Sequence, residues 1–183
     1  MSTENPWKTL SSSRVYTNPW MSVREDKVIR PDGQDGIYGV IETRVATGVV
    51  ALTPEREIYL VGQYRYPTEV YSWEIIQGGA DENEDRLSAC KRELQEEAGL
   101  VAETWTPIGG EIHLSNCISS ERGYVYAAEG LSNTEASPDG TEVLDLKKVR
   151  LSEAVRMAAC GEIVDAVSII GILLTEKWLG GSR

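Results

Sequence analysis

The sequence is poor in the residues that define several other classes of protein. It has a single histidine, His113, and three widely separated cysteines, Cys90, Cys117 and Cys160. One histidine cannot supply a multi-histidine metal site, and an odd number of cysteines without a CxxC pair indicates neither a disulfide framework nor a zinc site. We therefore expect the cysteines to be reduced and buried, as small apolar side chains usually are.

Positive charge and long apolar runs are also scarce. The 183 residues include 18 Lys and Arg against 29 Asp and Glu, which leaves a formal net charge of −11. Because nucleic-acid-binding proteins need a basic surface, nucleic acid is not an expected partner. No apolar run approaches the length of a membrane span, and residues 1–14 lack the apolar core of a signal peptide. We expect no membrane contact and a cytoplasmic location.

The most informative stretch covers residues 78–100. Its part from 84 to 98 contains neither Pro nor Gly, and its apolar residues recur at helical intervals. This pattern predicts an amphipathic helix that ends at Gly99.

One face of this predicted helix is acidic. Glu93, Glu96 and Glu97 stand at i, i+3 and i+4, so their carboxylates should lie side by side on its surface. Like charges at this spacing repel, and a hard cation such as Mg²⁺ would relieve the repulsion. By charge spacing alone, an ordinary solvated acidic face is the simpler interpretation.

The order of residues in this stretch is more specific than its charge. Gly78 is followed by five residues and Glu84, then by seven residues and the run RELQEEAGL from Arg92 to Leu100. The segment resembles the Nudix box at every defined position. The resemblance implies a metal-dependent hydrolase of diphosphates linked to another group. It also implies an α/β fold, the Nudix α/β/α sandwich with a mixed sheet between helices.

The resemblance also implies which groups hold the metal. Glu93 and Glu97 correspond to direct ligands, Glu96 to a further ligand that binds directly or through water, and the carbonyl of Gln77 is expected to join them. Mg²⁺ is the expected cation, with Mn²⁺ as the alternative.

Four box residues have implied structural roles. Arg92 and Glu84 match an ion pair that supports the helix, which requires Glu84 to sit at the bend before it. Gly78 and Gly99 match the turn into the box and the end of the helix.

The flanks of the box resemble the branch of ADP-ribose and nucleoside-diphosphate-sugar pyrophosphatases. A segment from Gln63 to Pro67 and a Trp73-Glu74 strand precede the box. The resemblance implies a small β-rich portion over residues 1–44, exchanged between the subunits of a homodimer, before a hydrolase domain over residues 45–183.

Substrate contacts are implied at three positions. Arg65 should contact the diphosphate or the terminal sugar, although an Arg beside aromatics is about as often stacked or paired at the surface. Trp20 is a candidate for stacking on the base, with packing in the core or the dimer interface as the favoured alternative. Glu121 could approach the metals, or simply occupy an exposed loop.

A later acidic loop is expected to carry the general base. Counted back from the helix that should cover residues 152–161, Glu142 matches the catalytic glutamate, with Asp139 in reserve and Glu96 as a further catalytic candidate. From charge alone, a solvated loop is the simpler interpretation. Asn116 stands where typical ADP-ribose pyrophosphatases have Pro, which favours a broader nucleotide-sugar range.

Other segments follow from turn signals and apolar patterns. A Pro-Asp-Gly turn at residues 31–33 predicts a hairpin, and residues 53–56 predict a second one between strands 45–52 and 58–63. Further strands are expected at residues 71–77, 124–128 and 143–149. An apolar helix over residues 163–174, capped by Asp165, should pack on the sheet opposite the box helix.

The sequence therefore predicts a Mg²⁺-dependent nucleoside-diphosphate-sugar pyrophosphatase that releases a nucleoside monophosphate and a sugar 1-phosphate. One alternative is a hydrolase of nucleoside triphosphates or dinucleoside polyphosphates. Another is a sensor that binds a nucleotide sugar without cleaving it.

Overall fold

A computed structural model describes residues 4–137 and 143–181 of the chain. Contacts along the chain divide it into two units. The first combines residues 1–44 with residues 113–122, and the second combines residues 45–112 with residues 123–183. Each unit is described by itself.

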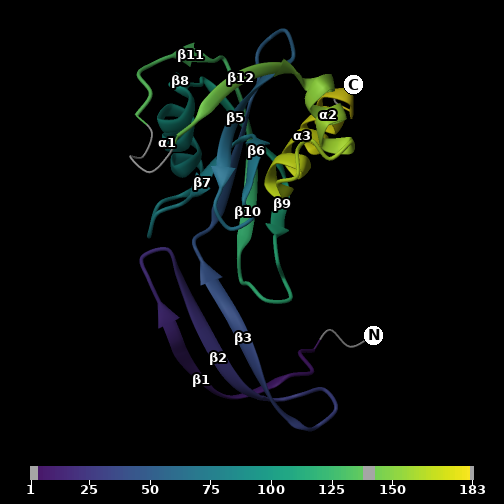
Figure 1. Cartoon of the computed structure of the whole chain (residues 1–183). Helices are drawn as coiled ribbons and strands as arrows, with labels where there is room; N and C mark the ends of the chain where they lie inside the picture. Colours follow the sequence, from purple (N-terminus) through teal and green to yellow (C-terminus); the bar gives the residue numbers. More distant parts are fainter. Residues whose placement is uncertain (1–3, 138–142, 182–183) are drawn as a thin grey trace. The chain divides into compact units, whose positions relative to one another are not determined.

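The first unit is built on three antiparallel strands, β1 (Lys8–Thr17), β2 (Met21–Ile29) and β3 (Asp35–Thr43), in the order β1-β2-β3 (Figure 1). The turn at residues 31–33 closes the β2–β3 hairpin as predicted, because Gly33 adopts a φ of 80° that favours glycine. The loop of residues 113–122 is tied to β3: Ile41 N donates to Ile118 O at 2.8 Å, and Ser120 N donates to Ile41 O at 3.0 Å.

A mixed four-stranded sheet forms the centre of the second unit. Its strands are β4 (Ala46–Ala51), β7 (Ile76–Gly79), β9 (Thr104–His113) and β10 (Arg122–Glu129), in the order β7-β4-β10-β9. The central strand β4 runs parallel to β10 and antiparallel to β7.

Helices α1 (Arg86–Ala98) and α3 (Ala166–Gly181) cover the two faces of this sheet (Figure 1). Alternate residues of β4 show this: Val49 and Ala51 share a core cluster with Leu94 of α1, whereas Val50 faces Gly171 of α3. Because successive side chains of a strand point to opposite faces of the sheet, β4 packs against both helices. The predicted sandwich, with the apolar helix opposite the box helix, is confirmed.

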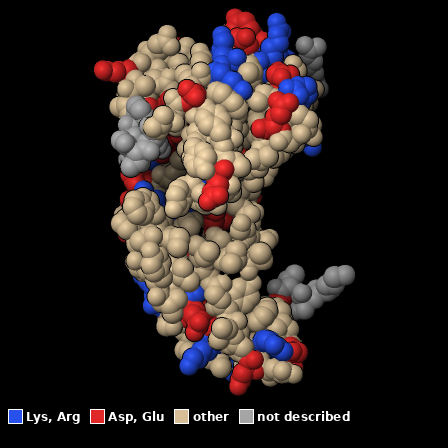
Figure 2. Space-filling model, viewed as in Figure 1, with Lys and Arg blue, Asp and Glu red and all other residues tan. Residues whose placement is uncertain are grey.

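The remaining elements complete the second unit. A second sheet has the order β12-β5-β6, with β5 (Glu57–Arg65), β6 (Val70–Glu74) and β12 (Asp145–Arg150), and a short pair joins β8 (Leu100–Val101) to β11 (Ser132–Asn133). Helix α2 (Leu151–Ala159) precedes α3, and acidic and basic side chains lie next to each other over these two helices (Figure 2). No helix in the described ranges is long and apolar enough to cross a membrane.

Two strand predictions are wrong. Residues 53–56 do not join a regular hairpin, because β4 and β5 meet at one isolated bridge, Leu52 to Ile58, and then enter different sheets. Strand β4 is buried almost throughout, so it occupies a sheet centre whose neighbours come from distant segments. Residues 71–77 likewise divide into β6 and β7, which belong to different sheets.

The expected burial of the cysteines is correct only in part. All three are free thiols, but Cys90 alone is buried, and Cys117 and Cys160 are exposed. Trp20, in the turn between β1 and β2, is 70% exposed and so does not pack in the core of the first unit.

Candidate functional site

The two ends of α1 are fixed by its own sequence. Asp85 accepts hydrogen bonds from Leu87 N at 3.0 Å and Ser88 N at 3.1 Å, which caps the first turn. Gly99 ends the helix with a φ of 61° and donates from its backbone N to Gln95 O. These caps set where the helix starts and stops, and therefore which side chains face β7.

Arg92 is the centre of an ion-pair cluster on this helix. Its Nε and Nη2 donate to Glu84 at 3.1 and 3.0 Å, and its Nη1 donates to Glu93 at 2.7 Å and Glu96 at 2.9 Å. Nη2 also donates to Gly79 O at 3.0 Å. Glu84 precedes the helix, and Arg92 holds the pKa of its carboxyl below the ordinary value. The expected ion pair between Arg92 and Glu84 is thus present.

The three box carboxylates are less exposed than the sequence suggested. Glu93 and Glu97 are only 7% and 6% exposed, whereas the side chain of Glu96 is 35% exposed. The alternative of a solvated acidic face therefore does not hold for Glu93 and Glu97, because this face of α1 packs against β7. Buried carboxylates need partners, and Gln77 N supplies one by donating to Glu97 Oε2 at 3.1 Å.

Gly78 is required by the position of Glu93. A Cβ added at Gly78 would lie 2.0 Å from Glu93 Oε1 and 2.1 Å from the Glu93 carboxyl carbon. Both distances are shorter than any normal contact between non-bonded atoms, so the Glu93 side chain would have to move. Glycine at this position therefore lets the Glu93 carboxylate stay where Arg92 binds it.

The donor set suits a hard divalent cation by its chemistry. Carboxylate and carbonyl oxygens are the ligands that Mg²⁺ and Mn²⁺ prefer. Within residues 4–137 and 143–181, however, no three acidic, histidine or cysteine side chains form a preassembled ligand group. Arg92 binds two of the expected ligands, Glu93 and Glu96, so a cation would compete with its guanidinium for them. The ligand roles of Gln77, Glu93, Glu96 and Glu97 stay predictions.

A second charged pair lies next to this cluster. Arg65 Nε donates to Glu74 Oε1 at 2.9 Å, and Arg65 Nη2 donates to Glu74 Oε2. The side chain of Glu74 is 2% exposed. Burial alone would raise the pKa of Glu74, but the hydrogen bonds and charge of Arg65 outweigh it and the pKa is lowered. Gln77 Nε2 also donates to Glu74, which connects this pair to the strand that contacts Glu97.

Sequence reasoning named Arg65 but gave no role to Glu74. The available signal was a single acidic residue in the otherwise apolar run WEII, where a charge that enters a core needs a cation. The contact of Arg65 with substrate stays a prediction, since one guanidinium edge is already bound by Glu74.

The other expected site residues fall into two groups. Trp20 and Glu121 belong to the first unit, and Glu121 N donates to Ser119 Oγ at 2.9 Å. Glu142 and Asp139, the expected general base and its reserve, lie outside the described residues.

Two family models match consecutive parts of the chain. Residues 7–41 match the nucleoside diphosphate sugar hydrolase N-terminal domain, and residues 42–167 match the NUDIX domain. The second match covers well over half of the chain.

Similar proteins carry several activities in their names. The chain is 31% identical over 173 residues to an ADP-ribose pyrophosphatase of Mycobacterium tuberculosis, covering 93% of this chain and 83% of that protein. It is 30% identical over 167 residues to a methanol dehydrogenase activator of Bacillus methanolicus, covering 90% of each. A solved ADP compounds hydrolase superposes with a TM-score of 0.85 over 99% of this chain and 98% of its own, at 20% identity, which shows a shared fold.

Proposed function

The chain belongs to the Nudix family, and we propose that it hydrolyses the pyrophosphate bond of nucleoside diphosphate sugars such as ADP-ribose in a metal-dependent reaction. The observation that carries this proposal is the complete carboxylate set of α1, held against β7 next to the Arg92 cluster. The match of residues 7–41 to the N-terminal domain of nucleoside diphosphate sugar hydrolases supports this class of substrate.

The side chains have distinct tasks in the proposed reaction. Divalent cations, when bound, neutralise phosphate charge and acidify water. Glu93 and Glu97, with Glu96 and the Gln77 carbonyl, would hold them. Arg92 stays anchored to Glu84 and keeps the turn before α1 in place.

The bond changes follow from hydrolysis of a diphosphate. The oxygen of a water attacks one phosphorus in line, and the bond from that phosphorus to the bridging oxygen breaks. We propose that Glu142 takes the proton of the water. The products are a nucleoside monophosphate and a sugar phosphate.

We also propose Mg²⁺ as the cation, with Mn²⁺ as a substitute, a cytoplasmic location, and a homodimer formed through the first unit. The apolar side chains that this unit leaves exposed support the dimer, since apolar patches of this kind often mark interfaces. Leu10, Val15, Trp20 and Ile37 are 55%, 58%, 70% and 68% exposed.

A substrate panel tests the proposal. The purified protein with Mg²⁺ is given ADP-ribose, ADP-glucose, GDP-mannose, UDP-glucose, ATP and a dinucleoside polyphosphate, and the phosphate products are identified, with EDTA as the control. Monophosphate plus sugar phosphate, lost in EDTA, is the expected result. Cleavage confined to ATP or dinucleoside polyphosphates would instead identify the first alternative, and binding without cleavage would identify the sensor.

The variant Glu97→Gln tests the metal ligand directly. Loss of one metal-binding carboxylate should reduce turnover by at least about 100-fold, because the cation stabilises the transition state by several kcal/mol. Glu176→Gln is the matched control, since Glu176 is an exposed glutamate on α3. Full activity in Glu97→Gln would refute this ligand.

A further inference from the structure

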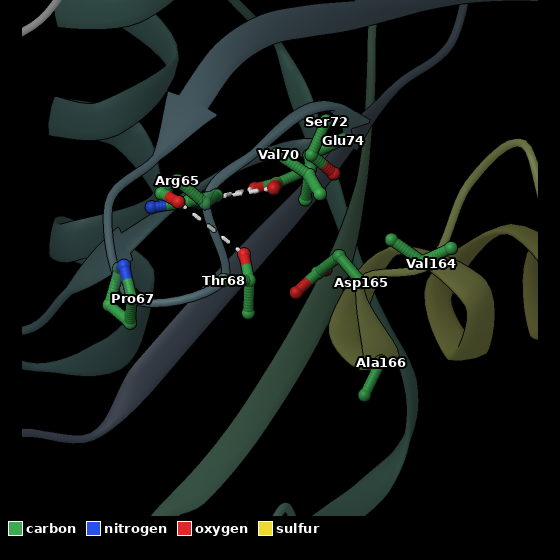
Figure 3. A pocket seen from close by; sticks show the side chains of 9 residues that line it. All are labelled: Arg65, Pro67, Thr68, Val70, Ser72, Glu74, Val164, Asp165 and Ala166. Atoms are coloured by element: carbon green, nitrogen blue, oxygen red, sulfur yellow. Dashed lines mark hydrogen bonds and ion pairs between the residues drawn. The ribbon is translucent and has the colours of Figure 1, made fainter.

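A cavity of about 310 Å³ lies in the second unit beside the candidate metal centre. Its polar lining comes from two segments of the chain: Arg65, Thr68, Ser72 and Glu74 from β5, β6 and their connecting turn, and Asp165 from the start of α3. Figure 3 shows the Asp165 side chain pointing across the cavity toward Thr68, with the Arg65–Glu74 pair above them.

Glu74 connects this cavity to the candidate metal centre. Its carboxylate accepts a hydrogen bond from Gln77 Nε2, and Gln77 N donates to Glu97 Oε2 at 3.1 Å. The hydrogen bonds from Arg65 to Glu74 raise the pKa of Arg65, and the charges of Asp165 and Glu97 raise it further. Glu74 contacts both Arg65, which lines the cavity, and Gln77, which contacts Glu97, so a group in the cavity would adjoin a diphosphate bound at Glu97.

Ser72 adds a buried hydroxyl to the lining of the cavity. The residue is 4% exposed, and its hydroxyl oxygen makes no hydrogen bond of normal geometry with the described residues. It lies close enough to Glu74 to help lower that carboxyl's pKa, but a hydroxyl both donates and accepts, so capacity remains unused. A buried hydroxyl with unused hydrogen-bonding capacity lowers the stability of the fold unless water or a ligand pairs with it.

The charge of the lining favours a neutral polar ligand. Arg65 and Glu74 offset one another, and Asp165 adds a carboxylate, so the lining is net negative. A further phosphate would be repelled, whereas hydroxyl groups can donate to the carboxylate. Val70 and Val164, which are 44% and 60% exposed, supply apolar walls suited to the C–H face of a sugar ring.

The size of the cavity also favours a sugar as the ligand. Ligand pockets range from roughly 300 to 1,000 Å³, so this cavity is at the lower limit and suits one sugar ring better than a whole nucleotide.

We propose that this cavity binds the terminal sugar of a nucleoside diphosphate sugar, with Asp165 and Ser72 hydrogen-bonded to the sugar hydroxyls. The assignment rests on the proposed function, because it places the sugar next to a diphosphate at the metal centre. It identifies two specificity-determining residues that lie outside the Nudix box, one of them at the start of α3.

Two variants weaken or remove these contacts with little structural change: Asp165→Asn removes the charge of the acceptor, and Ser72→Ala removes a hydroxyl. Asp165 caps α3 by accepting from Ser168 N at 2.7 Å, and Asp165→Asn keeps a side chain that can serve as the cap. Ser72→Ala removes only the buried hydroxyl. The control is Glu162→Gln, which removes a charge from the same α2–α3 connection at a side chain that is 52% exposed and outside the cavity.

Binding is measured by calorimetry in Mg²⁺ with the α,β-methylene analogues of ADP-ribose and of ADP, of which only the first has a terminal sugar. Asp165→Asn and Ser72→Ala should each weaken binding of the ADP-ribose analogue on the order of tenfold and leave the ADP analogue unchanged. Glu162→Gln should alter neither. Equal loss for both analogues, no loss for either, or a wild-type protein that binds neither would overturn the assignment.

Hydrolysis of ADP-ribose by the wild-type protein is assayed separately. If the two variants bind only the ADP-ribose analogue more weakly and the wild-type protein does not hydrolyse ADP-ribose, the sugar site is retained and the hydrolase activity is rejected. If the wild-type protein hydrolyses ADP-ribose but the two variants do not bind the ADP-ribose analogue selectively more weakly, the hydrolase activity is retained and the sugar site is rejected.

Discussion

At the scale of single residues, the site depends on a glycine that makes room for a carboxylate. Gly78→Ala would push its Cβ into the carboxyl group of Glu93, only 2.0 Å away, and displace this expected ligand. Displacements of about 1 Å in a catalytic site cost roughly 100-fold in rate, so we expect a loss of that order in turnover.

Gly110→Ala is the control for this variant. Gly110 lies on β9 with nothing within 4 Å of an added Cβ, so activity should be unchanged. Steady-state kinetics and circular dichroism of both variants make the comparison. An active Gly78→Ala protein with the wild-type fold would show that Glu93 need not hold its position.

The buried pair of Glu74 and Arg65 predicts a pH dependence of stability. Glu74→Gln should lower the free energy of unfolding at neutral pH by about 1 to 2 kcal/mol, a figure reduced by solvent screening because the Arg65 side chain is 38% exposed. The folded-state pKa of Glu74 is lowered, so this stabilisation is present above the ordinary value of 4.5 and is lost as the pH falls through the folded-state value.

Urea unfolding of both proteins across the acid range measures this effect. The difference between wild type and Glu74→Gln should shrink as the pH falls below 4.5. A difference in the free energy of unfolding that stays constant with pH would mean that the charge of the Glu74 carboxylate does not contribute to stability.

At the scale of elements, α1 owes its position to its caps as well as to its packing. Asp85→Ala removes the acceptor for Leu87 N and Ser88 N, and we expect the midpoint of thermal unfolding to fall by roughly 3 °C. Asp85→Asn keeps the cap and should unfold near the wild-type midpoint. Differential scanning calorimetry of the three proteins decides this, and equal midpoints for wild type and Asp85→Ala would contradict it.

At the scale of the whole molecule, the exposed apolar side chains of the first unit predict self-association. In the proposed homodimer, the double variant Leu10→Glu/Val15→Glu places charges in the interface, so the dimer should shift to monomer in sedimentation velocity. Val143→Glu, at a 90% exposed valine of the second unit, should stay dimeric. A double variant that remains a dimer would place the interface elsewhere.

The sequence by itself predicted the family, the box helix and the sandwich. The family and the sandwich came from the resemblance of residues 78–100 to the Nudix box. The helix is a local feature: its caps Asp85 and Gly99 act within one or two turns, and helical periodicity shows which face of α1 is apolar. The Pro-Asp-Gly hairpin could also be predicted from the sequence, because its turn requires a residue with positive φ and Gly33 provides it.

Only the tertiary structure decided which strands pair and which charges meet. Strand β4 took β10 and β7 as neighbours instead of the adjacent β5, because burial on both faces is satisfied by partners far along the chain. The Arg65–Glu74 pair and the cavity between β6 and α3 likewise depend on packing that the sequence patterns did not show. Local chemistry sets each element, but long-range packing sets which side chains share a site.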